Sequence, residues 1–222
     1  MIPAYNEEDR IGRAASRVLA SKYLAEKCRF LFIVDGNDNT FGILEKLKEP
    51  HPKAEMVVKR YPKRLGKGGA VAEGIKAAKT EYVGFLDVDT SIPMEKIEAM
   101  VKLLLEKKLD CIIGERKTVE GVPVFRKTSS RAFNLLVNAL FGLGVYDTQC
   151  GCKFFKRKLV YSGKGEVFRV KGFAFDVELL KKIKESGGRI TEHEMVGKWE
   201  GGKFSLFESP KMFLELVKLR LS

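Results

Sequence analysis

Five short apolar runs, separated by segments of helical periodicity, constrain this chain more than any other feature of its sequence. The segments between them carry apolar residues at every third or fourth position. Strands buried in a parallel sheet are continuous apolar runs, and each pair of parallel strands needs a crossover connection. The alternation therefore predicts an α/β fold with a doubly wound, mostly parallel sheet flanked by helices.

The expected elements follow from this pattern. Strands are predicted at the following residues: 1–2, 29–35, 54–60, 82–86, 110–114, 152–155 and 189–196. Helices are predicted as follows: from about residue 7 onward, then 40–48, from a glycine-rich turn at 66–69 through 79, then 93–107, 127–143, 176–186 and 209–221. The periodicity breaks after Glu115, and residues 116–126 are predicted to form a loop. No repeat or linker interrupts the chain, so we expect one domain over residues 1–222.

Composition limits the classes of protein to consider. The 222 residues are 45% hydrophobic, enough for a sizeable core, so wholesale disorder is excluded. Lys and Arg total 41 against 29 Asp and Glu, a net charge of +12. That surplus favours an anionic partner, which could be nucleic acid, a phosphorylated substrate or an anionic membrane. The alternative is a Lys-rich surface that serves only solubility. The usual nucleic-acid recognition motifs are missing, so we expect no nucleic-acid partner.

Other sequence features bear on compartment and membrane. The four cysteines lack the paired spacing of a zinc site. Nothing resembles a signal peptide, and no apolar stretch reaches the ~20 residues needed to span a bilayer. We therefore expect a cytoplasmic protein that is at most peripheral on the cytoplasmic face of a membrane. The sequence leaves its oligomeric state open.

Polar clusters follow three of the predicted strands, at residues 3–7, 35–38 and 87–89. Ligands of open α/β sheets bind outside the carboxyl ends of the strands, so these clusters predict one site. Asp87 and Asp89 are two residues apart, and in extended backbone they point the same way. Two carboxylates could thus hold one Mg²⁺ or Mn²⁺, which favour oxygen ligands. The alternative is a strand-end loop with two solvated acids.

A basic, glycine-rich turn at residues 63–70 precedes a predicted helix. Backbone N–H groups at a helix start favour an anion, and Lys67 adds a full positive charge. The spacing matches neither a P-loop nor a Rossmann turn, and a simple capping turn is the alternative.

Taken in order, these motifs resemble those of family 2 glycosyltransferases, which have the GT-A fold. The matching segments are Ile2-Pro3-Ala4-Tyr5-Asn6-Glu7-Glu8, the Asp35/Asp38 cluster, Gly66-Lys67-Gly68-Gly69-Ala70 and Asp87-Val88-Asp89. The D-T-Q-C-G-C-K segment at 147–153 resembles a signature of dolichyl-phosphate β-glucosyltransferases and their mannosyl relatives. Residues 175–180 and 199–203 are also similar to that subgroup. Each motif alone is weak, but the ordered series covers nearly the whole chain.

The resemblance implies roles for individual residues. Residues 1–114 would form a nucleotide-sugar-binding half and 115–222 an acceptor-binding half. The implied nucleotide-sugar contacts are Pro3, Ala4, Tyr5, Glu7, Asp35, Lys67, Gly68 and Asp87. Asp89, Asp147 and Gln149 would be catalytic, and Asp87 and Asp89 would bind the metal. Lys153 would border the sugar and the acceptor phosphate.

The chain departs from the family pattern at three points. Its Asp35-to-Asp38 cluster is one residue shorter than usual, which affects the role of Asp38. Thr90-Ser91 differs from the usual continuation of the acidic motif, which leaves any third metal ligand open. Only Met1-Ile2 precedes the Pro3-Ala4-Tyr5 turn, so we expect a short first strand.

The predicted loop and the helix after it combine basic and apolar residues. Arg116, Arg126 and Arg131 could bind the phosphate of a lipid acceptor, because guanidinium groups suit phosphate. The alternative is that these arginines are ordinary solvated charges. Apolar residues lie almost all around the following helix, and most of them could equally be core.

The implied reaction is inverting transfer of a hexose, by preference glucose from UDP-glucose, to a polyprenyl or dolichyl phosphate. Two alternatives keep the fold, namely a GDP-mannose donor or a polysaccharide or protein-glycan acceptor. A nucleotidyltransferase is the remote alternative, and it would release pyrophosphate instead of a nucleoside diphosphate.

Overall fold

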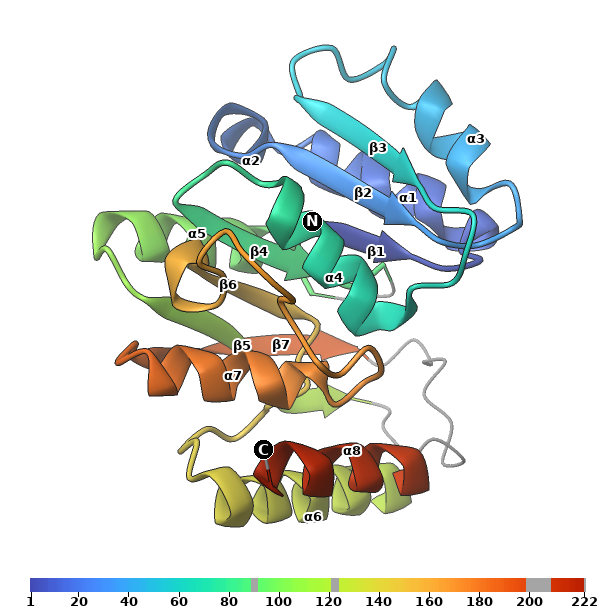
Figure 1. Cartoon of the computed structure of the whole chain (residues 1–222). Coiled ribbons are helices and arrows are strands. Elements are labelled where there is room, and N and C mark those ends of the chain that lie inside the picture. Colours follow the sequence, from blue (N-terminus) through green and yellow to red (C-terminus); the bar gives the residue numbers. More distant parts are fainter. Residues whose placement is uncertain (89–91, 121–123, 199–208, 222) are drawn as a thin grey trace.

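The computed structural model describes residues 1–88, 92–120, 124–198 and 209–221 (Figure 1). Within these ranges, the side chains of residues 117–120, 124–127, 196–198 and 209–211 are not described. The described residues alternate strands and helices as the sequence predicts.

The strands form one layer in the middle of the molecule. They are β1 (Ile2–Ala4), β2 (Phe30–Val34), β3 (Met56–Arg60), β4 (Tyr82–Leu86), β5 (Cys111–Glu120), β6 (Cys152–Lys156) and β7 (Ile190–Lys198). Pairing gives the orders β1-β2-β3 and β4-β6-β5-β7. The Leu86 N–H donates to the Met1 carbonyl at 3.1 Å, which joins β4 to β1. β6 runs antiparallel to β4 and β5, whereas the other described pairs are parallel, so the mostly parallel sheet is confirmed.

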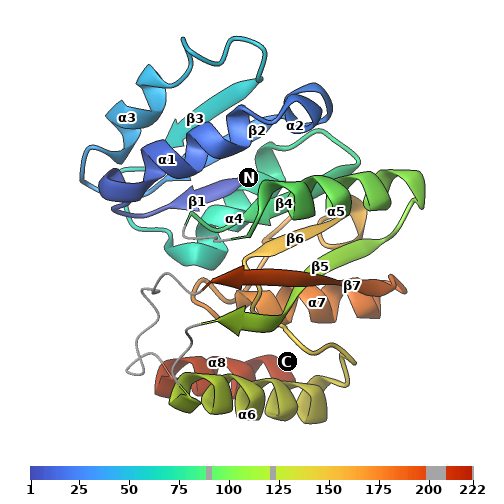
Figure 2. The ribbon, with the colours of Figure 1, turned by 180° about the vertical axis from the view of Figure 1, so that it is seen from behind.

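Helices cover both faces of this sheet. They are α1 (Glu8–Leu19), α2 (Lys22–Lys27), α3 (Thr40–Lys46), α4 (Gly66–Ala77), α5 (Met94–Glu106), α6 (Val124–Phe141), α7 (Phe175–Glu185) and α8 (Ser209–Leu221). Figure 1 looks onto α4 and α7, and Figure 2 shows α1 and α5 on the opposite face. In both views α6 and α8 lie side by side below the β5–β7 end of the sheet.

Each face of the sheet has its own hydrophobic core. The cluster that includes Ile75, Phe85 and Phe175 joins the sheet to α4 and α7 and extends to Val137 of α6 and Leu216 of α8. The opposite cluster joins the sheet to α1 and α5 and includes Ile11, Phe32 and Met100. Burial of these side chains is the main favourable contribution to folding.

The largest difference from the sequence-based expectation lies in the second half. The loop predicted over residues 116–126 is wrong, because β5 continues to Glu120 and α6 begins at Val124. Beyond Glu115 the strand pairs with β7, with a register shift between Glu115 and Thr118. Pairing with a strand distant in the sequence stabilises a polar segment whose local pattern does not indicate a strand.

Two smaller differences concern helix starts. The sequence analysis missed α2, whose N-cap Ser21 accepts a hydrogen bond from the Leu24 N–H at 3.1 Å. The glycine-rich segment predicted as a turn is the first turn of α4, which starts at Gly66 itself. Among the described helices, none is long and apolar enough to cross a membrane.

Candidate active site

The site lies where the carboxyl ends of β1, β2 and β4 meet at one edge of the sheet (Figure 1). Because β6 is antiparallel and pairs Cys152 with Leu86, the segment that precedes β6 reaches the same edge. This topology brings the predicted donor residues and the 147–153 segment together, as open α/β sheets commonly do at their ligand edge.

The turns after β1 and β2 are fastened to each other. The Asp35 N–H donates to the Ala4 carbonyl at 3.2 Å, and the Asn37 N–H donates to Asn6 Oδ1 at 3.0 Å. Asn6 has φ of 52°, a left-handed conformation that asparagine tolerates. A Cβ at Gly36 would lie 2.3 Å from Asn6 Oδ1, so only glycine permits this approach.

Asp35 connects these turns to the start of α4. Its carboxylate is 6% exposed and accepts hydrogen bonds from Leu65 N–H at 2.7 Å and Gly66 N–H at 3.2 Å. Burial raises the pKa of Asp35, and the two backbone donors offset only part of that rise. Beside it, the Arg64 guanidinium stacks 4.2 Å from the ring centre of Tyr5, which is 38% exposed. The pair offers a flat surface of the kind on which a nucleotide base stacks.

Residues 3–8 and 38–40 form the outer part of this edge. Pro3 lies within β1, and the Glu7 carboxylate pairs with Arg10 at 2.7 Å. The Glu7 N–H donates to Thr40 Oγ1 at 2.9 Å. Asp38 accepts from the N–H groups of Glu8 at 3.0 Å and Thr40 at 3.1 Å. Asp38 therefore ties the first turn of α1 to the first turn of α3.

Asp87 is held between α4 and the turn before β6. Lys67 Nζ donates to Asp87 Oδ2 at 2.8 Å, and the Asp87 N–H donates to the Gly151 carbonyl at 2.8 Å. A Cβ on Gly151 would lie 2.0 Å from Asp87 Oδ2, and one on Gly68 would lie 2.6 Å from the Val170 carbonyl oxygen. Gly151 thus permits close packing against the predicted donor carboxylate, and Gly68 permits close packing of α4 against Val170 and Phe175.

Lys153 lies beneath the site, not at its surface. It has no exposed area, and its ammonium donates to Asp176 Oδ1 at 2.5 Å and to the Cys150 carbonyl at 2.6 Å. This burial corrects the expectation that Lys153 contacts an acceptor phosphate, because a buried ammonium already paired with a carboxylate is shielded from such a ligand. Asp176 was not among the predicted site residues. Its Oδ2 lies 3.7 Å from Lys67 Nζ, so it belongs to the same group of charges.

Two predicted site residues, Asp147 and Arg116, are brought into direct contact. Arg116 donates through Nε to Asp147 Oδ2 at 2.7 Å and through Nη2 to Oδ1 at 3.0 Å. Burial alone would raise the pKa of Asp147, but the charge and hydrogen bonds of Arg116 outweigh it and lower that pKa below its usual value. Glu192 of β7 accepts from the Asp147 N–H at 3.3 Å, and its own pKa is raised by burial and by neighbouring acids.

Two asparagines of α6 position the segment before β6. Asn134 Oδ1 accepts from both the N–H, at 3.0 Å, and the hydroxyl, at 2.7 Å, of Thr148. Asn138 donates to the Val145 carbonyl at 2.7 Å and accepts from the Gly144 N–H at 2.8 Å. The sequence contained a signal for this positioning role, because Asn134 and Asn138 are the two amides that interrupt the apolar pattern of this helix.

The remaining predicted site residues make few described contacts with the groups above. Gln149 donates its side-chain amide to the sulfur of Met212 in α8 at 3.4 Å. Arg131 is exposed on α6. Asp89 lies outside the described residues, and Arg126 lies in α6 with its side chain outside them.

A metal site is only partly described. Within residues 1–88, 92–120, 124–198 and 209–221, no three His, Cys, Asp or Glu side chains gather closely enough to hold a metal ion. The Asp87 carboxylate nevertheless binds a cationic group, the Lys67 ammonium, which shows that its oxygen is directed toward positive charge. Carboxylate oxygens also suit Mg²⁺ or Mn²⁺.

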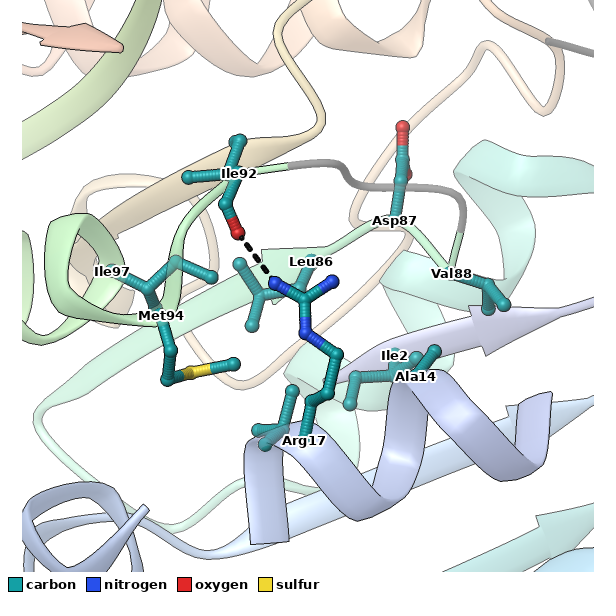
Figure 3. A pocket seen from close by; sticks show the side chains of 10 residues that line it. Ile2, Ala14, Arg17, Leu86, Asp87, Val88, Ile92, Met94 and Ile97 are labelled. Atoms are coloured by element: carbon teal, nitrogen blue, oxygen red, sulfur yellow. Dashed lines mark hydrogen bonds between the residues drawn. The ribbon is translucent and has the colours of Figure 1, made fainter. Parts of the chain in front are cut away.

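The cavity in Figure 3 adjoins this site, because Asp87 is one of the residues that line it. It lies between α1, the end of β4 and the start of α5, where Arg17 donates to the Ile92 carbonyl at 3.1 Å. Its walls are mostly apolar, and in Figure 3 the Asp87 carboxylate points away from it. A volume of about 20 Å³ has room for about one water molecule, so this cavity is no donor pocket.

Known proteins resemble this chain over most of its length. The dolichyl-phosphate beta-glucosyltransferase of Dictyostelium discoideum is 26% identical over 245 residues, which cover 99% of this chain and 72% of that protein. The human protein of the same name is 28% identical, over 81% of this chain and 60% of its own length. Glycosyltransferase AglD of Haloferax volcanii is 28% identical, over 86% of this chain and 31% of its own length.

Solved structures share the fold. Glucosyl-3-phosphoglycerate synthase from Mycobacterium tuberculosis, in complex with Mn²⁺ and UDP-glucose, matches with a TM-score of 0.73 and 21% identity, over 99% of this chain and 77% of that one. The mannosyltransferase PcManGT from Pyrobaculum calidifontis, in complex with GDP-mannose and Mn²⁺, matches with a TM-score of 0.70 and 16% identity. The match covers 99% of this chain and 61% of that one.

The family assignment rests on the sequence itself. The profile described as Glycosyl transferase family 2 matches residues 1–164, which include the strand-end acids, the start of α4 and the whole segment before β6. The GT-A-like arrangement of the sheet agrees with that match. The chain belongs to glycosyl transferase family 2.

Proposed function

We propose that this protein transfers glucose from UDP-glucose to a polyprenyl or dolichyl phosphate. The observation that carries the proposal is the contact between Asp87 and Gly151, whose backbone groups are hydrogen-bonded at 2.8 Å. It joins the acid expected at the donor to the 147–153 segment, which resembles lipid-phosphate glucosyltransferases. The names of the similar curated proteins support the same acceptor, and the UDP-glucose complex of a structural neighbour supports the donor.

Asp87 and Asp89 would hold the divalent cation, either Mg²⁺ or Mn²⁺. Both structural neighbours above carry Mn²⁺, which supports a divalent cofactor without deciding between the two ions. When bound, the ion would neutralise charge on the departing diphosphate. The Lys67 ammonium and the N–H groups at the start of α4 would add positive potential there.

The reaction needs alignment more than proton transfer. A phosphate oxygen of the acceptor attacks the anomeric carbon of glucose, the bond from that carbon to the diphosphate oxygen breaks, and UDP leaves with inversion. A phosphate monoester is already anionic at neutral pH, so Asp147 need not act as a base. Its pairing with Arg116 suggests that Asp147 orients that guanidinium, while Gln149 would border the sugar.

The acceptor side would be formed by Arg116 of β5 and by Arg126 and Arg131 of α6. Exposed Arg131 is the simplest test. Replacing it with Ala should raise the KM for polyprenyl phosphate and reduce kcat/KM by about ten- to a hundredfold, as expected for a lost charge-assisted hydrogen bond. Lys at this position should rescue only partly, because it lacks the planar fork. Unchanged lipid kinetics would remove Arg131 from the acceptor site.

We also propose that α6 and α8 face a membrane surface. Five large apolar side chains are exposed on α6, on α8 and in the loop after α6: Leu135, Tyr146, Phe213, Leu214 and Leu221. Exposed Arg131, Lys218 and Arg220 lie on the same two helices. Anionic lipid attracts such basic groups by about 1 kcal/mol each. An apolar surface with a basic margin is what an interfacial helix needs.

Vesicle flotation tests this contact. A Phe213→Ser/Leu214→Ser variant should float less than wild type with vesicles rich in anionic lipid, because both side chains are exposed and their loss leaves the core intact. Val57→Ser removes one exposed apolar side chain from β3, 44% exposed against 49% for Phe213 and 60% for Leu214, and serves as the control away from α6 and α8. Equal flotation of both variants, or no flotation of wild type at low salt, would exclude a membrane role for α8.

One assay decides between the activities that remain open. The chain is incubated with polyprenyl phosphate, Mn²⁺ and a panel of nucleotide sugars, and release of UDP, GDP and pyrophosphate is measured. UDP release from UDP-glucose that depends on the lipid supports the proposal. GDP release from GDP-mannose would favour the mannosyl alternative, and lipid-independent transfer to an added glycan would identify a different acceptor. In a parallel incubation with a nucleoside triphosphate and hexose 1-phosphate, pyrophosphate release would identify a nucleotidyltransferase.

A further inference from the structure

Lys67 is held between two carboxylates. Its ammonium lies 2.8 Å from Asp87 Oδ2 and 3.7 Å from Asp176 Oδ2, and the side chain is 17% exposed. The rings of Phe85, Phe173 and Phe175 surround it at 5.7, 5.9 and 5.6 Å. The aromatic groups limit where the ammonium can go, while both carboxylates stay within reach. A small movement of one side chain is therefore enough to change its partner.

Asp176 is fixed so that one of its oxygens remains directed at Lys67. It is 1% exposed, and its Oδ1 accepts from the buried Lys153 ammonium at 2.5 Å. It lies in the first turn of α7, where the helix dipole favours negative charge. Two lysines thus approach its two oxygens. Lys153 is the permanent partner, because it is completely buried, whereas Lys67 reaches the edge of the site.

Among the residues that the structure describes, which do not include Asp89, the charges of this group balance without any ligand. Asp87 and Asp176 contribute two negative charges, and Lys67 and Lys153 contribute two positive ones. A divalent cation bound at Asp87 without a nucleotide would lie beside the Lys67 ammonium and be repelled by it. A cation that arrives with a diphosphate brings its own negative oxygens, which can receive Lys67. The two ligands should then bind together much better than either binds alone.

We infer that Lys67 occupies, in the donor-free protein, the place on Asp87 that the donor's divalent cation takes, and that Lys67 then turns to Asp176 and the diphosphate. The inference rests on the proposed use of a nucleotide-sugar donor and names the residue that couples the metal to the nucleotide. Lys67 acts as a built-in counter-ion that keeps the acidic site closed to free metal ions. The competing interpretation is an ordinary structural ion pair between Lys67 and Asp87, with no effect on that coupling.

Titration calorimetry on the metal-stripped full chain tests the inference. Mn²⁺ is titrated with and without saturating UDP, and the ratio of the two affinities is the coupling factor. In wild type this factor should exceed about tenfold, within the usual range of coupling between two sites. In Lys67→Met, Mn²⁺ alone should bind more tightly, UDP should bind more weakly, and the factor should fall by about fivefold or more. Asp87 is 22% exposed, so water can solvate it when Lys67 is absent.

Two further variants make the result specific to position and charge. Lys76→Met removes the same charge from the same helix, at a lysine paired with Glu73 away from the site, and should leave the coupling unchanged. Lys67→Arg keeps the positive charge and should keep Mn²⁺ binding weak in the absence of UDP.

The outcomes separate this inference from the proposed function. If Lys67→Met binds Mn²⁺ alone no better than wild type, or keeps the full coupling factor, the counter-ion role is wrong even though the enzyme uses a nucleotide donor. If Lys76→Met changes the coupling as much as Lys67→Met does, the effect is one of overall charge and the inference also fails. If neither UDP nor GDP binds wild type with Mn²⁺, both the inference and the proposed function are overturned.

Discussion

The contact between Gly151 and Asp87 can be tested by adding one methyl group. In Gly151→Ala the new Cβ would lie 2.0 Å from Asp87 Oδ2, 2.3 Å from its Cγ and 2.7 Å from its Cβ. These atoms must separate by more than about 1 Å before the contact becomes an ordinary van der Waals one. Asp87 cannot simply rotate away, because its own Cβ is among the atoms in conflict. The backbone at the end of β4 or before β6 must therefore move.

Two effects of different size follow from that movement. Forcing a group into packed structure costs about 1–3 kcal/mol of unfolding free energy. A displacement of about 1 Å in a catalytic group can reduce the rate by about a hundredfold. We therefore expect a folded protein with a modest loss of stability and a large loss of kcat/KM. UDP release in the presence of polyprenyl phosphate gives the rate, and urea unfolding followed by circular dichroism gives the stability.

A matched glycine provides the control. Gly12 lies inside α1, where an added Cβ would meet Ile43 Cγ2 at 3.6 Å, an ordinary contact. Gly12→Ala should stabilise the protein by about 0.5–1 kcal/mol and leave activity unchanged. If Gly151→Ala keeps wild-type stability and a kcat/KM within about threefold of wild type, the close approach of Gly151 to Asp87 does not position the donor site.

Three further predictions concern the rest of the site. Asn134→Ala should cost about 1–3 kcal/mol of stability, because it leaves the buried N–H and hydroxyl of Thr148 without an acceptor, and it should lower kcat; urea unfolding and UDP release check both. Arg116→Met should be less stable than wild type at neutral pH, because Arg116 stabilises the charged form of Asp147. The difference should shrink below about pH 4, because a protonated Asp147 gains nothing from the arginine. Thermal unfolding from pH 3 to 7 measures it, and a constant difference would contradict this pairing. Asp89→Ala should abolish turnover with an unchanged circular dichroism spectrum, and chelator should inactivate wild type until Mg²⁺ or Mn²⁺ is restored; full activity in excess chelator would exclude a metal.

The fold could be predicted from the sequence where local pattern and tertiary structure agree. The predicted bounds of 82–86 and 209–221 are those of β4 and α8. In these segments an apolar run or an amphipathic period coincides with the final packing. β5 shows the limit of this reasoning. Its last residues, 116–120, are polar and basic, and they become a strand only because β7, some 80 residues later, lies beside them.

The site divides in the same way. Sequence reasoning placed Asp35 and Asp87 at one edge, because the topology of an α/β sheet determines where strand ends meet, and the family resemblance added Lys67. Sequence reasoning could not predict which charged groups pair with each other, because pairing depends on distances between separate elements of the fold. Lys153 is the clearest case. The family resemblance implied a contact between Lys153 and the acceptor phosphate, whereas the fold buries this side chain against Asp176, which is rare for a lysine.

The 147–153 segment shows how one short stretch of chain can connect several elements of the fold. Its residues each contact a different part of the fold: Asp147 binds Arg116 of β5, Thr148 binds Asn134 of α6, Gly151 packs against Asp87 after β4, and Lys153 binds Asp176 of α7. Each of these four residues makes a separate tertiary contact, so the segment links β5, α6, the end of β4 and α7. Substitutions within it should accordingly be non-additive, because each displaces a segment on which the other contacts depend. A double-mutant cycle between Asn134→Ala and Gly151→Ala should show coupling in kcat/KM, although these two residues share no direct contact. Strict additivity would mean that the segment positions its residues independently, and the motif would then be a set of separate sites.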